Sequence, residues 1–328
     1  MIHSKLSICI PTYNRPEPLK NTIENLVNNI YKKDFLREIL IVDNSENNDS
    51  KDIVKNFLKD YSKIRYIKNH TNLGAEGNFK KSIYEAAGEY VWIIGDDDIL
   101  EKDSQNLLDN RFKIDFDCLI VNWNVYDFNL KDPVVFNIMK GSDSIYNDKD
   151  LILKEFGLKF SFISSIIFKK QLFESKHNTA YNEFKKYGLS FLVFVYSIFL
   201  NESNLIFFEK TSLIRQRGVN NNYLSRADKY YNIFAKGFSN VFDFLDSKGY
   251  SRIAIRSSKI DSFYHYIVRD LINRKINNNE FDTAFRYAKL FYGDILIIKC
   301  ILLMIYLIPN PIFVFLKFIK KFYHDKFY

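Results

Sequence analysis

The stretch that decides the fold is Gly88-Glu89-Tyr90-Val91-Trp92-Ile93-Ile94-Gly95-Asp96-Asp97-Asp98-Ile99-Leu100. Its residues Tyr90 to Ile94 are β-branched or aromatic, a pattern that predicts a strand buried on both faces. The strand runs directly into three carboxylates, which repel one another and need a counter-charge in a folded protein. We expect that counter-charge to be a divalent cation with oxygen ligands, Mn²⁺ or Mg²⁺. The alternative is a solvated, Asp-rich turn.

Predicted strands and helices alternate along the N-terminal third of the chain. We expect strands over residues 6–10, 37–42 and 64–67, and helices over residues 18–30, 52–58 and 75–87. Pro11 is expected to end the first strand, and Gly88 the last of these helices. This alternation predicts an α/β protein with a doubly wound, mostly parallel sheet and helices on both faces. Further buried strands are expected over residues 117–121, 160–168 and 205–208.

Polar residues follow the predicted strands, and the connections of a doubly wound sheet place those strand ends on one edge. Asp43, Asn72 and the carboxylates of residues 96–98 are therefore expected to converge on one crevice. The sequence has neither Gly-x-Gly-x-x-Gly after the first strand nor a Gly-Lys-Ser/Thr P-loop, which excludes the common dinucleotide-binding and NTPase functions. A bound diphosphate would then be held by a metal and by cationic side chains.

The composition is that of a folded, basic protein of 328 residues. It is 47% hydrophobic and 17% aromatic, which allows a sizeable core and excludes global disorder. The net charge of +8 suits an anionic partner such as a nucleotide or a phospholipid surface. Nucleic acid is not expected, because the basic residues are dispersed and the Asp cluster would repel phosphates without a metal. Three scattered cysteines fit a reducing compartment, so we expect a cytoplasmic protein.

Four short motifs occur in order within roughly residues 5 to 125. They are Ser7-Ile8-Cys9-Ile10-Pro11-Thr12-Tyr13-Asn14-Arg15, Ile41-Val42-Asp43-Asn44-Ser45, Asn69 to Gly74, and Gly95-Asp96-Asp97-Asp98. Together they resemble the motifs of the family-2 glycosyltransferases, which have the GT-A fold and make bacterial surface polysaccharides. The resemblance implies an inverting transfer of a sugar from a nucleotide diphosphate sugar. It implies a UDP-sugar as the expected donor and Mn²⁺ or Mg²⁺ as the cofactor.

Matching these motifs residue by residue implies a set of site residues. Asp43 would accept hydrogen bonds from the base, Asp96 would bind the ribose, and Asp97 or Asp98 would bind the metal. The residues expected to line the donor-nucleotide pocket are Pro11, Thr12, Tyr13, Arg15, Asp43, Asn72, Gly74 and Asp96.

The sequence departs from the family's pattern in three places. The second motif reads Asp-Asn-Ser where the family usually has Asp-Asp-Gly-Ser, and Gly95 stands where the first Asp of Asp-x-Asp is usual. The Glu-Asp pair that usually supplies the general base is absent from the second half. Glu183 is the leading candidate for that base and His177 the second. The alternative for Glu183 is a solvated carboxylate at a helix start.

A basic, amide-rich loop is expected over residues 214–222, after the predicted strand at 205–208. Its Arg215 and Arg217 suit a mobile lid that neutralises the leaving diphosphate; the alternative is a solvated loop. The Gln-x-x-Arg-Trp motif of processive synthases does not occur in the sequence, so the transfer of a single sugar is expected.

The resemblance implies a GT-A domain over residues 1–225, and the sequence predicts a helical region over residues 226–328 with an amphipathic tail from about 294. Residues 295–308 are apolar except for Lys299, a run shorter than the roughly 18–20 residues that span a bilayer. We expect interfacial helices that bind the inner face of the cell membrane, where a polyprenyl-linked acceptor would be presented. The alternative is a helical pair packed on the catalytic domain or on a second subunit of a homo-oligomer.

Three functional hypotheses follow from these observations. The first is a metal-dependent inverting glycosyltransferase that acts on a lipid-linked glycan in capsule, O-antigen or lipooligosaccharide synthesis. The second is a nucleotidyltransferase that activates a sugar, although residues 11–16 are not the Gly-rich loop of such enzymes. The third is a non-catalytic protein that binds a nucleotide sugar or a membrane.

Overall fold

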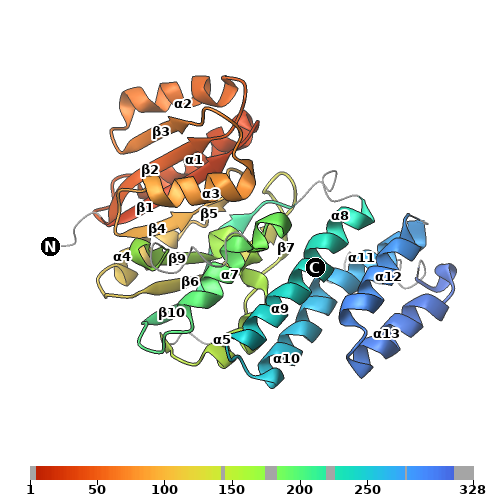
Figure 1. The fold of residues 1–328 in the computed structure, drawn as a ribbon. Coiled ribbons are helices and arrows are strands. Elements are labelled where there is room, and N and C mark those ends of the chain that lie inside the picture. The colour runs from red at the N-terminus through yellow and green to blue at the C-terminus, as the bar shows by residue number, and fades with distance from the viewer. Residues whose placement is uncertain (1–4, 142–144, 174–182, 219–225, 278, 314–328) are drawn as a thin grey trace. The chain divides into compact units, whose positions relative to one another are not determined.

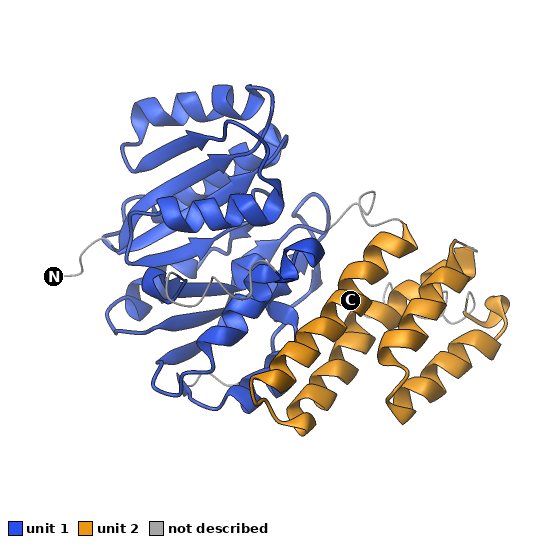
Figure 2. Cartoon of the chain, in the orientation of Figure 1, with its two compact units in different colours: residues 1–220 blue, residues 221–328 orange. Residues whose placement is uncertain are grey.

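The computed structural model describes residues 5–141, 145–173, 183–218, 226–277 and 279–313 (Figure 1). The chain divides into two compact units, residues 1–220 and residues 221–328 (Figure 2). The domain boundary predicted between residues 225 and 226 falls at the end of an undescribed stretch and stays a prediction.

The first half of unit 1 alternates parallel strands and helices (Figure 1). Its elements are β1 (Leu6–Thr12), α1 (Pro16–Ile30), β2 (Leu36–Asp43), α2 (Asp49–Asp60), β3 (Ile64–Lys68), α3 (Gly74–Glu85) and β4 (Tyr90–Ile93). The strands pair in parallel in the order β3-β2-β1-β4. Right-handed crossovers in this order place α1 and α2 on one face of the sheet and α3 on the other.

The second half of unit 1 extends the same sheet. Its elements are β5 (Ile99–Leu100), α4 (Ser104–Arg111), β6 (Cys118–Tyr126), β7 (Pro133–Val135), β8 (Ile145–Tyr146), α5 (Lys149–Phe156), β9 (Ile166–Lys169), α7 (Ser190–Ile198) and β10 (Ile206–Gln216). β9 lies antiparallel between β4 and β6, and the described sheet runs β3-β2-β1-β4-β9-β6-β10-β5. The predicted α/β fold class is confirmed, and the sheet is mixed rather than wholly parallel.

The first strand is longer than predicted, because it continues through Pro11 to Thr12. The carbonyl of Cys9 accepts a hydrogen bond from the N–H of Ile94 at 2.9 Å, so residues 9 and 11 both direct their backbone groups toward β4. β4 has ended at this level. Proline has no N–H to donate, but β4 offers no acceptor at this level, so no hydrogen bond between β1 and β4 is lost. Because the backbone of Pro11 faces away from β2, the ladder between β1 and β2 continues past it.

Three other sequence predictions are wrong in detail. α3 ends at Glu85, and Gly88 has no positive φ; instead, a Cβ at Gly88 would lie 2.5 Å from the carbonyl oxygen of Lys5, so close packing requires the glycine. Residues 160–168 are strand only from Ile166, and 3₁₀ turns precede it. The loop predicted from residue 214 begins later, because β10 extends to Gln216.

Unit 2 is helical, as predicted. One long segment joins α8 (Ala227–Tyr231), a π turn (Asn232–Gly237) and α9 (Phe238–Ser247); another joins α10 (Arg252–Ser262), a π turn (Phe263–Val268) and α11 (Arg269–Asn277). α12 (Phe281–Tyr292) and α13 (Leu296–Leu307) follow. α8, the two π turns, α11, α12 and α13 share one apolar core, in which Tyr231, Phe263 and Tyr292 are fully buried.

α13 contains most of the predicted amphipathic tail that the structure describes. It buries Ile298, Leu302 and Ile305 in the core of unit 2, Ile301 packs partly buried against that core, and Leu296, Ile297, Leu303, Met304, Tyr306 and Leu307 are exposed. Among the described helices, none has the length and apolar character that crossing a membrane requires. Residues 314–328 of the predicted tail lie outside the described part of the chain.

Candidate active site

The polar residues predicted to converge follow the carboxyl ends of neighbouring parallel strands, at one edge of the sheet. β1 ends at Thr12 and β2 at Asp43, which are partners in the parallel ladder, and β4 on the other side of β1 leads into Asp96 to Asp98. The N–H of Asn14 donates to Ser45 Oγ at 2.8 Å and so ties the loop after β1 to the loop after β2. Two polar clusters result, one on each side of β1.

The first cluster holds Asp96, which is 5% exposed. Thr12 Oγ1 donates to one carboxylate oxygen of Asp96 at 2.7 Å, and Arg15 Nη1 donates to the other at 2.8 Å. Arg15 Nη2 also pairs with Asp97. Burial raises the pKa of Asp96 to about 6, although Arg15 and Thr12 oppose that rise. Arg15 therefore supplies part of the counter-charge that the sequence led us to expect from a metal.

Asp98 is the most enclosed of the three carboxylates. Ser164 Oγ donates to Asp98 Oδ2 at 2.8 Å, and the backbone N–H of Arg217 also bonds to this carboxylate. Burial first, and then the charge of Asp97, raise the pKa of Asp98 to about 7. The N–H of Gly95 donates to Ser164 Oγ at 3.1 Å, so Ser164 holds both ends of the acidic turn.

Gly95 and Thr22 set the shape of that turn. Thr22 Oγ1 of α1 contacts the carbonyl oxygens of Asp96 and Asp98 at 3.1 and 3.0 Å. A Cβ at Gly95 would lie 2.7 Å from Asp98 Oδ2 and 3.4 Å from Asp97 Oδ1. The carboxylates of Asp97 and Asp98 thus flank the position that a side chain at residue 95 would occupy, and glycine leaves that space open. Within the described residues, no group of three or more His, Cys, Asp or Glu side chains is placed to hold a metal.

The second cluster surrounds Asp43, whose side chain is fully buried. Tyr66 OH donates to Asp43 Oδ2 at 2.7 Å, Lys68 Nζ lies 3.3 Å from the same oxygen, and the N–H of Ser45 donates to Oδ1 at 2.7 Å. The predicted neighbour Asn72 lies close by, because Asn44 Nδ2 donates to Asn72 Oδ1 at 2.8 Å.

Tyr13 of the first motif and Gly74 of the third lie near the ends of their motifs, and each is exposed, unlike the buried residues above. Gly74 has a φ of +71°, which favours glycine, and its N–H donates to the side chain of Asn72 at 2.9 Å. Tyr13 is 45% exposed, and its backbone N–H bonds to the carboxylate of Asp96. Its ring is therefore available to a ligand at this edge.

The two predicted lid arginines differ. Arg215 lies in β10, donates to Glu101 at 2.7 Å and stacks on Tyr126, so its placement in a loop was wrong. Arg217 follows the strand, with its guanidinium 5.0 Å from the ring centroid of Phe128. Its Nε is buried and has no hydrogen-bond partner in the part of the chain that the structure describes.

The two candidates for the general base remain predictions. Glu183 has an exposed side chain and directly follows the undescribed residues 174–182. His177 lies within those residues, outside the described chain. Sequence reasoning missed the roles of Ser164 and Thr22, because nothing in an apolar run or on a helix face indicates a hydroxyl that will meet a distant carboxylate.

Comparison with known proteins gives a consistent result. Residues 7–188 match the model of Glycosyl transferase family 2. The chain is 29% identical over 230 residues to the abequosyltransferase RfbV of Salmonella typhimurium, an alignment that covers 66% of this chain and 68% of that relative. It is also 29% identical over 178 residues to a GalNAc(5)-diNAcBac-PP-undecaprenol beta-1,3-glucosyltransferase of Campylobacter jejuni, over 52% of this chain and about half (54%) of the relative's length.

Solved structures share the fold. Residues 1–349 of S. aureus TarS, crystallised with UDP-GlcNAc, superpose with a TM-score of 0.58 at 15% identity, over 88% of this chain and 81% of TarS. The mannosyltransferase PcManGT of Pyrobaculum calidifontis, in complex with GDP-Man and Mn²⁺, gives a TM-score of 0.54 at 11% identity, over 92% and 79% of the two chains. At these identities the likeness shows the fold alone. Since the family model covers more than half of the chain, the protein is a glycosyltransferase that uses a nucleotide sugar, and it belongs to glycosyl transferase family 2.

Proposed function

We propose that this protein transfers a single sugar, with inversion, from a UDP-sugar to a lipid-linked glycan in the synthesis of a bacterial surface polysaccharide. The observation that supports the proposal is the pair of clusters along one sheet edge. Asp43 lies buried in one, and Asp96 to Asp98 lie with Arg15 in the other. A nucleobase at the Asp43 cluster and a diphosphate at the cluster of Asp96 to Asp98 would match the order of polar groups.

The second cluster, around Asp43, suits a nucleobase. Asp43 Oδ1 accepts one bond, from the N–H of Ser45, so it keeps a lone pair for an N–H of the base. Tyr66 and Lys68 hold the other oxygen and balance the charge. Pro11, Thr12, Tyr13, Asn72 and Gly74 would line the same pocket, and Asp96 would receive the ribose.

The acidic turn fits a divalent metal that the substrate completes. Asp97 and Asp98 would hold Mn²⁺ or Mg²⁺ through the two oxygens beside Gly95. Two protein carboxylates suit a cation that takes its remaining ligands from water and a diphosphate. When bound, the metal would neutralise the leaving nucleoside diphosphate. PcManGT, which shares the fold, is known in complex with Mn²⁺.

Two further roles belong to residues of this chain. Arg217, with its unpartnered and buried Nε, is proposed to bind the diphosphate; Arg215 is the second candidate, although Glu101 already engages it. Glu183 is proposed as the general base that deprotonates the acceptor hydroxyl, and its exposure leaves it accessible. His177 is the second candidate for that base.

A lipid-linked acceptor is supported by the name of the Campylobacter relative, which specifies an undecaprenol diphosphate glycan. Such an acceptor would be met at the inner face of the cell membrane, to which the C-terminal helices would bind. Assembly of a homo-oligomer through these helices stays a prediction.

Thermal-shift measurements with UDP, GDP, CDP and dTDP, each with Mn²⁺ or with EDTA, test the donor site. We expect selective stabilisation by UDP that EDTA reduces. Stabilisation by another diphosphate would correct the base, and none by any of them, with the fold intact, would overturn the proposal.

Asp98→Asn tests the metal role, because it keeps the shape of the side chain and removes a charged ligand. We expect the Mn²⁺-dependent part of the UDP shift and sugar transfer to be lost. Asp132→Asn, the same change at an exposed position, is the matched control. If turnover and metal dependence both survived in Asp98→Asn, the metal assignment would be wrong.

A further inference from the structure

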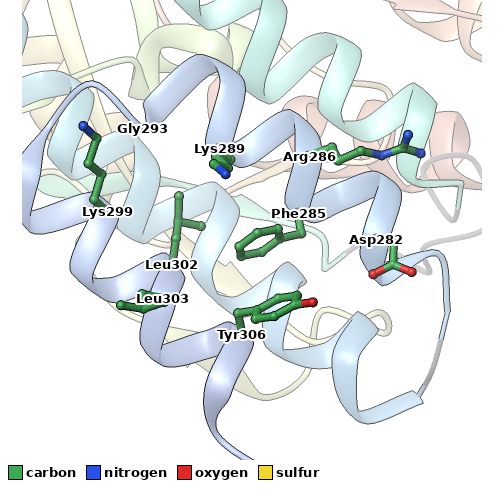
Figure 3. Close-up of a pocket in the computed structure, with 9 residues that line it drawn as sticks. All are labelled: Asp282, Phe285, Arg286, Lys289, Gly293, Lys299, Leu302, Leu303 and Tyr306. Atoms are coloured by element: carbon green, nitrogen blue, oxygen red, sulfur yellow. The ribbon is translucent and has the colours of Figure 1, made fainter.

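α12 and α13 of unit 2 enclose a groove of about 950 Å³ (Figure 3). Its floor is apolar, and Phe285 of α12 meets Tyr306 of α13 there with ring centroids 5.1 Å apart. Three basic side chains also line it: Arg286 and Lys289 on α12, and Lys299 on α13. The groove thus combines an aromatic floor with cationic walls.

The three cations of this groove are not paired with carboxylates of the described residues. All three side chains are exposed, and none of them forms an ion pair with a carboxylate of the described chain. Asp282 also lines the groove, one turn before Arg286, but the two are not paired. Three cations against one anion leave the lining positive, so an anionic group would be attracted to it.

The apolar character continues outward from the groove along α13. Exposed on that helix are Leu296, Ile297, Leu303, Met304 and Leu307, four of them more than half exposed. No acidic residue occurs between residues 295 and 313. An apolar helix face with cations at its border and no anions is the pattern of a helix that lies in a lipid headgroup layer.

We propose that this groove binds an anionic phospholipid of a bilayer, with an acyl chain against Phe285 and Tyr306 and the phosphate among Arg286, Lys289 and Lys299. A soluble anion would leave the aromatic floor in water, and an uncharged lipid would leave three cations unpaired. An anionic phospholipid meets both requirements, because its acyl chain covers the aromatic floor and its phosphate pairs with the cations. The exposed apolar face of α13 would enter the headgroup layer of the bilayer beside it. The inference deepens the proposed membrane association by naming its site.

Co-sedimentation of the full-length protein with phosphatidylcholine vesicles, with or without phosphatidylglycerol, tests the proposal. We expect binding that requires phosphatidylglycerol. The triple variant R286Q/K289Q/K299Q should bind on the order of 100-fold more weakly at low salt, since each cation near an anionic surface contributes about fivefold. The matched control K236Q/K248Q/R256Q removes three exposed cations of unit 2 outside the groove and should bind as the wild type does.

A second pair of variants tests the apolar half of the site. Leu303→Asn together with Leu307→Asn should weaken vesicle binding, whereas Ile253→Asn, at a 73% exposed position on α10, should not. These positions are exposed, so the fold should persist. Equal binding to neutral vesicles, equal loss in the groove and control triples, or no vesicle binding by the wild type would each overturn the proposal.

The donor site is followed in the same samples through the UDP thermal shift. A groove variant that loses vesicle binding and keeps its UDP shift would support the lipid site independently of the proposed catalytic function. Binding that required a polyprenyl phosphate in neutral vesicles, with no response to phosphatidylglycerol, would make the groove an acceptor site and overturn the phospholipid assignment.

Discussion

Gly88 and Gly95 of unit 1 both stand where a Cβ atom would meet neighbouring atoms, but the neighbouring atoms differ. At Gly95 the atoms that a Cβ would meet are carboxylate oxygens of Asp98 and Asp97, so the glycine protects the candidate metal site. At Gly88 the nearest atoms are the backbone of Lys5 and Ser7, at 2.5 and 2.6 Å, so the glycine protects sheet packing. The same substitution should therefore have different consequences.

We predict that Gly95→Ala displaces the Asp98 carboxylate and lowers sugar transfer on the order of 10–100-fold, with a small change in melting temperature. Gly88→Ala should instead cost about 1–3 kcal/mol of stability, because backbone atoms cannot move aside as easily as a side chain. Turnover and thermal unfolding of both variants check this. A Gly95→Ala enzyme with wild-type turnover would show that the turn tolerates the methyl group.

Glu76 of α3 is a buried carboxylate outside the two clusters. It is 6% exposed and accepts a hydrogen bond from the N–H of Ser190, at the start of α7, at 3.1 Å. Burial raises the pKa of Glu76 to about 7, although Ser190 and the charge of Lys185 oppose the rise. Between these two pKa values, near 4.5 in the unfolded chain and about 7 in the folded protein, Glu76 is protonated in the folded state and ionised in the unfolded state.

The pH dependence follows from that difference. The contribution of protonated Glu76 to the stability of the fold is present in full below about pH 4.5. It is lost as the pH rises through 7, because ionisation of the buried carboxyl then opposes folding. Glu76→Gln keeps an acceptor oxygen and cannot ionise. We predict that it melts with the wild type near pH 5 and several degrees above it at pH 8. Glu46→Gln, at an exposed position, should show no such trend, and an equal trend in both would contradict the assignment.

At the scale of a single element, α13 depends on a residue from another helix. Lys275 of α11 donates to the carbonyl oxygens of Ile305, Tyr306 and Ile308, the last at 2.8 Å. These carbonyls lie at the C-terminal end of α13, where no further turn of the helix can bond them. A cation there also complements the helix dipole. The lysine therefore fixes the end of the helix that forms one wall of the groove.

We predict that Lys275→Met lowers the stability of unit 2 by about 1–2 kcal/mol and speeds amide exchange in α13. Methionine keeps most of the apolar stem, so the loss measures the charged hydrogen bonds. Lys236→Met, at an exposed position, is the control. Unchanged exchange across α13 would mean that the packing of Ile298, Leu302 and Ile305 holds the helix without the lysine.

At the scale of the whole molecule, the chain has two separate cores. Unit 1 buries the sheet strands, and unit 2 buries the inner sides of its helices. The candidate donor site lies entirely in unit 1, and the groove lies entirely in unit 2. A ligand of one unit should therefore act on the stability of that unit.

Calorimetry should then show two unfolding transitions. UDP with Mn²⁺, at about 100 times its dissociation constant, should stabilise the transition of unit 1 by about 2.7 kcal/mol and leave the other unchanged. Lys275→Met identifies the transition of unit 2, because it lowers that one alone. A single transition that moved as a whole with UDP would contradict the independence of the two cores.

Much of the fold could be predicted because local patterns decide it. The buried run of residues 90–94, the alternation of strands and helices, and the polar residues at the strand ends together determined a doubly wound sheet with Asp43 and Asp96 to Asp98 on one edge. Hydrophobic spacing encodes which face of an element is buried, and chain connectivity encodes the order of parallel strands. Both are properties of the sequence itself.

The partners of the polar groups were decided by the tertiary structure alone. Ser164 meets Asp98 because β9 inserts antiparallel beside β4, and Arg15 reaches Asp96 across more than eighty residues. Arg215 became a strand residue paired with Glu101 because β10 continues past its apolar run. A hydrophobic pattern specifies that a side chain is buried, but the register between distant strands specifies which hydroxyl, carboxylate or guanidinium it meets.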